Sequence, residues 1–151
     1  MHRILRTDSE NGDFVALVKA LDAYLAITDG DEHAFYSQYN KIDKINHVIV
    51  FYEHENPIGC GALKAFDDLA MEVKRMFVPI DERGKGIATL VLQELEKWCK
   101  DLNYEKCILE TGEKQPEAVK LYQKNNYKII PNYGQYAEVA SSICFEKKVN
   151  K

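Results

Sequence analysis

The sequence has few cysteines, and they do not form a metal-binding or disulfide-framework pattern. The four cysteines are scattered along the chain, with no CxxC pair and no histidine at metal-ligand spacing: Cys60, Cys99, Cys107 and Cys144. Zinc modules and small disulfide-stapled scaffolds rely on regular cysteine spacings. We therefore expect no metal site and no disulfide framework, but reduced and mostly buried thiols.

Long apolar runs and an excess of positive charge are also missing. No stretch approaches the roughly 20 apolar residues that span a bilayer, and the first eight residues lack the apolar core of a signal peptide. The formal net charge is −4, whereas binding to nucleic-acid phosphates usually requires a basic face. We expect a cytoplasmic protein with neither a membrane nor a nucleic acid as its partner.

What is present is the composition of an ordinary globular protein. The 151 residues include 46% hydrophobic and 29% charged residues, which suits one domain with a closed core. No repeat, low-complexity tract or linker divides the chain. We expect a single domain over residues 1–151.

Hydrophobic periodicity predicts a helical start, a β meander and then a βαβαββ series. Strands are predicted over residues 2–6, 47–52, 58–66, 70–78, 106–110, 127–130 and 142–147, with a turn at Asn56-Pro57. Helices are predicted over about 13–27 (ended by Gly30), 32–39, 85–102 and 116–124, the third with Glu94, Glu96, Lys97 and Lys100 on its wet side. This order predicts a mixed α/β (α+β) fold, with a mainly antiparallel twisted sheet of about six or seven strands and helices on both faces.

The turn at residues 83–88 has the features of an anion site. It follows a predicted strand, opens a predicted helix and reads Arg83-Gly84-Lys85-Gly86-Ile87-Ala88. Two glycines let successive backbone N–H groups point into one concavity, and the helix start adds unpaired amides and partial positive charge. Arg83 and Lys85 could add side-chain charge. From these residues alone, a tight turn with solvated charges is an equally good interpretation.

The same residues exclude two nucleotide-binding motifs. A Walker loop needs Gly-Lys followed by Ser or Thr, whereas Gly86 follows Lys85. A dinucleotide fingerprint needs a third glycine in a parallel βαβ unit, whereas this turn has two and follows a meander strand.

Three segments together resemble the GNAT (Gcn5-related N-acetyltransferase) superfamily. Arg83-x-x-Gly86-x-Ala88 is similar to its pyrophosphate-binding motif, and Met76-Phe77-Val78-Pro79 resembles the strand end before that motif. Residues 118–127, AVKLYQKNNY, resemble the family's helix end A-x-x-L-Y-x-K-x-G-[FY]. The order of elements resembles the GNAT fold across nearly the whole chain. Runs such as Leu109-Glu110-Thr111-Gly112 resemble a bacterial subgroup of small, largely uncharacterised acetyltransferases.

The resemblance implies acetyl-CoA as cosubstrate. It implies that Arg83, Gly84, Lys85, Gly86, Ile87 and Ala88 hold the pyrophosphate, and that the backbone at Met76, Phe77 and Val78 serves the pantetheine arm and the oxyanion. Gln115 stands where many members have an asparagine that touches the cofactor, and it keeps the amide on a longer side chain. Asn126 replaces the usual glycine of the helix end and tolerates the left-handed conformation.

Acetyl transfer from a thioester to an amine needs a neutral amine, a stabilised oxyanion and a protonated leaving thiolate. Tyr122 matches the helix tyrosine that the family is proposed to use as the proton donor, and a phenol stays protonated at neutral pH. The alternative is that Tyr122 is simply an aromatic side chain at a helix–sheet contact.

The general base has three candidates. Glu72 precedes Arg83 by the same offset as the catalytic glutamate in the histone-acetylating branch of the superfamily, although it could also be a surface residue paired with Lys74 or Lys64. Glu110 at a strand end is its rival. A water chain is the third possibility.

The acceptor side of the superfamily is formed by the first two helices and the loop between the last strands. Here these segments supply side chains that could line a pocket or simply pack or lie on the surface: His33, Tyr36, Tyr39, Tyr133 and Tyr136. The expected acceptor is the primary amine of a small molecule. The alternatives are a lysine or N-terminus of a protein, or a CoA-binding regulatory module without turnover. Homodimers are common in the superfamily, and one is possible here.

Overall fold

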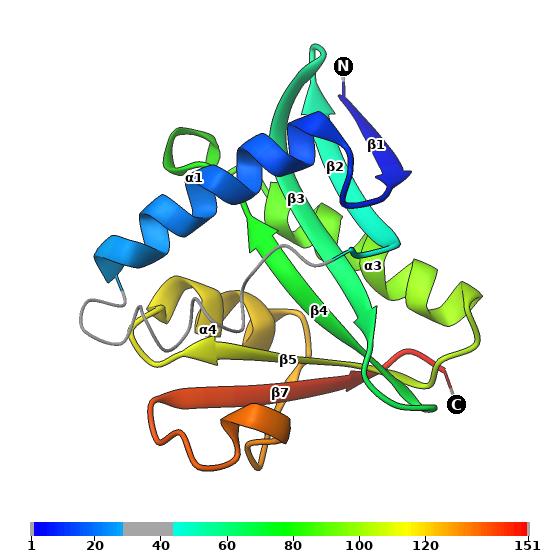
Figure 1. Ribbon diagram of the computed structural model, residues 1–151, viewed down its shortest axis with the longest axis vertical. Coiled ribbons are helices and arrows are strands. Elements are labelled where there is room, and N and C mark those ends of the chain that lie inside the picture. Colours follow the sequence, from blue (N-terminus) through cyan, green and yellow to red (C-terminus); the bar gives the residue numbers. More distant parts are fainter. Residues whose placement is uncertain (1, 29–43, 151) are drawn as a thin grey trace. The chain divides into compact units, whose positions relative to one another are not determined.

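A computed structural model describes residues 2–28 and 44–150 of the chain. The expected helix end at Gly30, the short helix at 32–39 and the side chains of His33, Tyr36 and Tyr39 lie outside the described residues. The elements, drawn in Figure 1, are β1 (His2–Thr7), α1 (Gly12–Thr28), β2 (His47–Glu53), β3 (Asn56–Ala65), β4 (Ala70–Phe77), η2 (Ile80–Glu82), α3 (Ile87–Asp101), β5 (Lys106–Gly112), α4 (Pro116–Lys124), β6 (Lys128–Ile130), η3 (Gly134–Tyr136) and β7 (Ser142–Lys148).

The strands form one seven-stranded sheet in the order β1-β2-β3-β4-β5-β7-β6. β1 and β2, β2 and β3, β5 and β7, and β6 and β7 pair antiparallel, whereas β4 and β5 pair parallel. The predicted class, a mixed and mainly antiparallel sheet of six or seven strands, is confirmed.

The chain forms two compact units. The first contains residues 1–64 and 73–95, and the second contains residues 65–72 and 96–151. The boundary falls within β4, after Glu72, and within α3, after Leu95.

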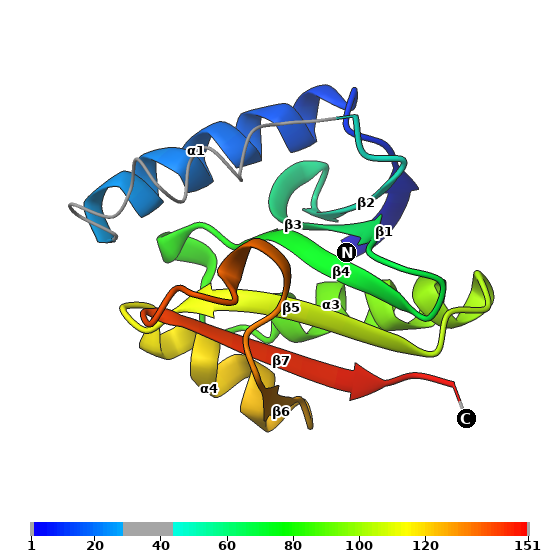
Figure 2. The ribbon, with the colours of Figure 1, turned by 60° about the horizontal axis from the view of Figure 1, so that its bottom comes forward.

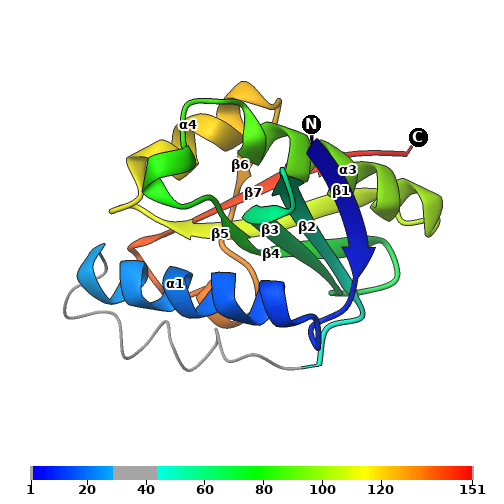
Figure 3. The same cartoon turned by 90° about the horizontal axis from the view of Figure 1, so that it is seen from above.

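In the first unit, helices cover both faces of the strands (Figure 3). The core on the α1 side contains Phe14, Leu17, Val18, Leu21, Ile45, Val48, Val50, Tyr52, Cys60, Ala62 and Phe77. On the other side of β3, a side chain at Gly59 would meet Ile87, and one at Gly61 would meet Val91 and Leu95 of α3. Successive residues of a strand face opposite sides of the sheet. Cys60 and Ala62 of β3 therefore face the α1 side, whereas Gly59 and Gly61 face α3.

The turn predicted at Asn56-Pro57 is wrong. The hairpin between β2 and β3 turns at His54 and Glu55, which both have positive φ (51° and 66°), as a two-residue hairpin with a right-handed twist requires. Asn56-Pro57 instead begins β3, and Pro57 lies opposite Tyr52 beside a register shift. Proline has no N–H to donate, and an irregularity in the ladder is where a strand tolerates it.

In the second unit, α4 and the 3-10 turn η3 lie on opposite sides of β5 and β7 (Figure 2). Leu109 pairs with Phe145, and the ring of Phe145 packs against Tyr122 of α4. Glu110 pairs with Cys144 one residue further along, so these two side chains belong to the face away from α4.

Several sequence signals correspond to the observed element ends. α4 begins at Pro116 and ends at Lys124, as predicted, and Asn126 has a φ of 71°. The four cysteines are free thiols and buried, also as predicted. Within residues 2–28 and 44–150, no helix is long and apolar enough to cross a membrane.

Candidate functional site

The turn before α3 is shaped by two glycines of the first unit. Gly84 and Gly86 have φ values of 83° and 81°, in the left-handed region that favours glycine. A Cβ atom built on either glycine would meet no heavy atom within 4 Å. The turn therefore has open space beside its backbone, which is what a bound anion needs.

The start of α3 contributes backbone donors to the same turn. The first helical hydrogen bond runs from the Leu90 N–H to the Gly86 carbonyl at 3.1 Å. The N–H groups of Ile87 and Ala88 precede this ladder, so the helix itself does not use them. Together with the positive end of the helix dipole, such N–H groups attract phosphate.

The two basic side chains of the turn are already engaged. Arg83 Nε donates to the Val78 carbonyl at 2.8 Å, and its guanidinium lies 4.8 Å from the centre of the Tyr24 ring. Lys85 Nζ pairs with Glu82 Oε2 at 2.7 Å, and this contact raises the pKa of Lys85. Both basic side chains of the turn therefore already have partners within the protein.

The strand end predicted to serve the pantetheine arm lies beyond the parallel pairing of β4. The β4–β5 ladder joins residues 70–72 to residues 106–108, and β4 continues to Phe77. Within this continuation Arg75 has a φ of 59°, which interrupts the regular strand just before Met76. Phe77 and Val78 are buried, whereas Met76 is half-buried.

Tyr122 lies in a helix–sheet contact of the second unit. Its side chain is 6% exposed, and its ring centre is 5.7 Å from that of Tyr127 and 5.8 Å from that of Phe145. Burial, and then the negative charge of Glu110, raise the pKa of Tyr122. The phenol therefore remains a proton donor throughout the neutral range.

A polar network that the sequence did not reveal holds Tyr127, the neighbour of Tyr122. The Tyr127 phenol donates to Glu96 Oε2 at 2.9 Å, and Lys147 Nζ lies 2.9 Å from Glu96 Oε1. Glu96 was predicted on the wet side of its helix, but it is buried. The Tyr127 phenol and the Lys147 ammonium group pair with its carboxylate and so compensate for its burial. Helical periodicity alone cannot predict such partners.

The two candidate bases each accept a short hydrogen bond. The Tyr133 phenol donates to Glu72 Oε2 at 2.6 Å, and the Ser142 hydroxyl donates to Glu110 Oε2 at 2.6 Å. Glu72 is only 8% exposed, so it is not the surface residue of the alternative interpretation. Glu110 is half-buried.

Electrostatic effects link these groups into one cluster. Burial raises the pKa of Tyr136, with further contributions from Glu110 and then Glu72. Burial also raises the pKa of Cys144, and the negative charges of the same two carboxylates raise it further. We call Glu72, Glu110, Tyr133, Tyr136 and Ser142 the acidic–tyrosine cluster. Four of these residues, all except Ser142, were already candidates from the sequence, each for a separate reason. The role of Ser142 and the hydrogen bonds to Glu72 and Glu110 could not be predicted from the sequence.

Gln115 caps the start of α4 through its backbone. Its N–H donates to the Gly112 carbonyl at 3.0 Å, and its carbonyl accepts from Val119 at 3.1 Å. The side chain makes no capping hydrogen bond. Across the described part of the chain, no group of three or more His, Cys, Asp or Glu side chains could hold a metal ion.

The chain matches known proteins over most of its length. A profile of the Acetyltransferase (GNAT) family matches residues 14–127. An uncharacterised N-acetyltransferase of Bacillus subtilis, YsnE, is 32% identical over 100 residues, which is 65% of this chain and 66% of that protein.

Solved structures share the fold over almost the whole chain. A crystal structure assigned to an acyl-CoA N-acyltransferase from Klebsiella pneumoniae has a TM-score of 0.82 at 23% identity, covering 99% of this chain and 98% of that one. The PaiA N-acetyltransferase of Thermoplasma acidophilum, solved with coenzyme A, has a TM-score of 0.68 at 20% identity, covering 98% and 99%. The family match spans more than half of the chain. The protein therefore belongs to the acetyltransferase (GNAT) family.

Proposed function

We propose that this protein is an acetyl-CoA-dependent N-acetyltransferase that acts on the primary amine of a small molecule by direct sequential transfer. The observation that carries the proposal is the open, doubly left-handed glycine turn at the start of α3, in a chain of the GNAT family. The coenzyme A bound to the Thermoplasma acidophilum neighbour supports the choice of cofactor.

Acetyl-CoA would supply the thioester and an anionic pyrophosphate. Both glycines of the turn leave open space, and the start of α3 offers N–H donors, so these residues fit a pyrophosphate. We assign this binding to Arg83, Gly84, Lys85, Gly86, Ile87 and Ala88. We assign the pantetheine arm to the backbone of Met76, Phe77 and Val78, with the N–H near Phe77 stabilising the oxyanion. Gln115 adds an amide contact.

Glu72 is the proposed general base. It is buried, its carboxylate is oriented by the Tyr133 phenol, and proton removal from an ammonium needs such a fixed acceptor. Glu110 is less buried and contributes negative charge that attracts a cationic acceptor. Tyr122 is the proposed general acid, since its phenol stays protonated until the thiolate leaves.

The acidic–tyrosine cluster supports a small cationic amine as the acceptor. Two carboxylates attract an ammonium group, and tyrosine rings provide apolar walls with polar tips for an aliphatic chain. The four buried free thiols also suit a reducing compartment, which supports a cytoplasmic location.

The proposal is tested by an acceptor screen that follows thiol release from acetyl-CoA with amino acids, polyamines, aminoglycosides and peptides. We expect release with a small cationic amine, and a loss of about 10²-fold in kcat for Glu72→Gln. Glu55→Gln is the control, because Glu55 is an exposed carboxylate of the first unit. Turnover with peptides alone would instead favour the protein-acetylating alternative. CoA binding without any turnover would favour the regulatory module.

A further inference from the structure

We infer that Tyr133 is a positioning residue that fixes the catalytic carboxylate of Glu72; this inference rests on the base assignment of the proposed function. The two side chains come from distant parts of the second unit. Glu72 belongs to β4, whereas Tyr133 precedes η3 in the connection between β6 and β7. A hydrogen bond of 2.6 Å between them joins the proposed base to the connection between β6 and β7.

The direction of this hydrogen bond is fixed by burial. Burial, and then the charge of Glu72, raise the pKa of the Tyr133 phenol far above its ordinary value. The phenol is therefore the donor at every pH at which the enzyme would work, and the Glu72 carboxylate is the acceptor. A hydrogen-bond donor limits the rotation of a carboxylate, and a general base needs a fixed orientation.

Packing holds the phenol in place. The ring of Phe66 meets the ring of Tyr133 edge-on, with centres 5.1 Å apart, and the ring of Tyr136 also meets it edge-on, with centres 6.0 Å apart. Gly134, which follows Tyr133, has a φ of 53°, and a Cβ there would lie 3.5 Å from the Phe66 ring. Phe66 itself is 44% exposed, so its position in the β3–β4 hairpin is not explained by core burial. Its ring packs instead against Tyr133 and Gly134.

The hydrogen bond also couples the base to the acceptor. Because Tyr133 belongs to the loop that we expect to contact the acceptor, an acceptor that displaces this loop also moves the Glu72 carboxylate. An amine that displaces the loop would then lower kcat, because it moves the base. Its contacts with the loop would still determine KM. A misplaced catalytic group loses rate even when binding is unchanged.

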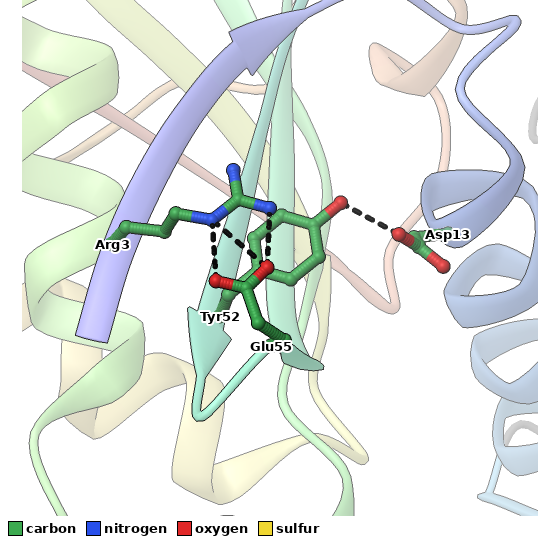
Figure 4. A network of polar contacts seen from close by, with 4 residues as sticks. All are labelled: Arg3, Asp13, Tyr52 and Glu55. Atoms are coloured by element: carbon green, nitrogen blue, oxygen red, sulfur yellow. Dashed lines mark hydrogen bonds and ion pairs between the residues drawn. The ribbon is translucent and has the colours of Figure 1, made fainter. Parts of the chain in front are cut away.

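The test compares Tyr133→Phe with a matched loss of a phenol elsewhere. The control is Tyr52→Phe, because the Tyr52 phenol donates to Asp13 Oδ2 at 2.7 Å in the first unit (Figure 4). Both variants lose one short phenol–carboxylate bond and keep the ring. We expect Tyr133→Phe to lower kcat by about tenfold or more with KM nearly unchanged, and Tyr52→Phe to leave both parameters near wild type.

Two further variants distinguish the possible failures. In a Glu72→Gln background, adding Tyr133→Phe should cause little further loss, because the two residues act as one unit. Should Tyr133→Phe fail to fold, Phe66→Ala keeps the phenol, removes its support and should lower kcat in the same direction. Full activity in Tyr133→Phe would overturn this inference alone. Full activity in Glu72→Gln would overturn the base assignment beneath it.

Discussion

Tyr122 shows how one buried side chain can be compatible with two interpretations of a sequence motif, a packing role and a catalytic one. It packs between aromatic rings at a helix–sheet contact, as an ordinary core tyrosine does. The same burial raises the pKa of its phenol and keeps the proton available. A phenol with a raised pKa is a weaker acid, so it keeps its proton while the thioester is intact.

Replacing the Tyr122 phenol should therefore affect chemistry and not binding. Tyr122→Phe keeps the ring contacts and removes the donor, so turnover should fall by about 10²-fold with nearly unchanged CoA affinity. Steady-state thiol release and calorimetry with CoA measure the two effects. Tyr104→Phe is a control at a half-buried tyrosine of the same unit. Wild-type turnover in Tyr122→Phe would remove this residue from the mechanism.

At the residue scale, the sequence could identify chemistry but not pairing. Glu72, Glu110, Tyr133 and Tyr136 stood out through a resemblance or through their place in a tyrosine-rich loop. Their partners depend on which side chains meet across strands and loops, and Ser142 illustrates this. Ser142 was predicted only as the start of a strand, yet its hydroxyl donates to Glu110.

At the element scale, the contact between β3 and α3 depends on glycines of β3, because the side chains packed around them leave no room for a Cβ atom. A Cβ at Gly61 would lie 2.7 Å from Met76 Sδ, 2.8 Å from Leu95 Cδ1 and 3.0 Å from Val91 Cγ1. The first two distances are shorter than real Cβ contacts and the third is tight, so these neighbouring side chains would have to shift. The helix α3, which begins at the proposed pyrophosphate turn, therefore packs against glycines of β3 that present no side chain to it.

Gly61→Ala should destabilise the protein by about 1–3 kcal/mol, as expected for overpacking of a core. The free energy of unfolding in urea, measured by circular dichroism, checks this value. Gly12→Ala is a matched control at the first residue of α1, because a Cβ there meets nothing within 4 Å. If both variants are equally stable, the packing argument for α3 is wrong.

The accuracy of the predicted elements follows from the strength of their local signals. α4 was placed correctly at both ends because Pro116 suits a helix start and Asn126 suits a left-handed stop. The β2–β3 turn was misplaced because His54 and Glu55 adopt positive φ without being glycine or asparagine. Asn56-Pro57 looked like a turn, yet it lies in a strand.

At the scale of the whole molecule, the strand order brings together residues that are far apart in sequence. Glu72 pairs with Ile108 across the parallel β4–β5 ladder, and Glu110 pairs with Cys144 across β5–β7. Periodicity predicts each strand by itself, but register and neighbours are set by the tertiary fold. The fold was therefore predictable from element order and family resemblance, whereas the acidic–tyrosine cluster was not.

We propose that the two compact units unfold together as one domain. β4 and α3 each run across the boundary between them, so unfolding one unit would fray elements of the other. Fluorescence of Trp98, the single tryptophan, reports on the second unit, and amide hydrogen exchange in α1 reports on the first. Coincident transitions in urea are expected. Two separate midpoints would show that the units are independent domains.

Calorimetric titration of coenzyme A into the wild-type protein and into Gly86→Val tests the central claim most directly. Valine is strained at a φ of 81°, and its side chain would occupy the open space beside the turn. Circular dichroism checks that the variant is folded. We predict one CoA site per wild-type chain and no measurable binding to Gly86→Val. Equal affinity of the two proteins, or no binding to wild type, would contradict the assignment of this turn as the pyrophosphate site.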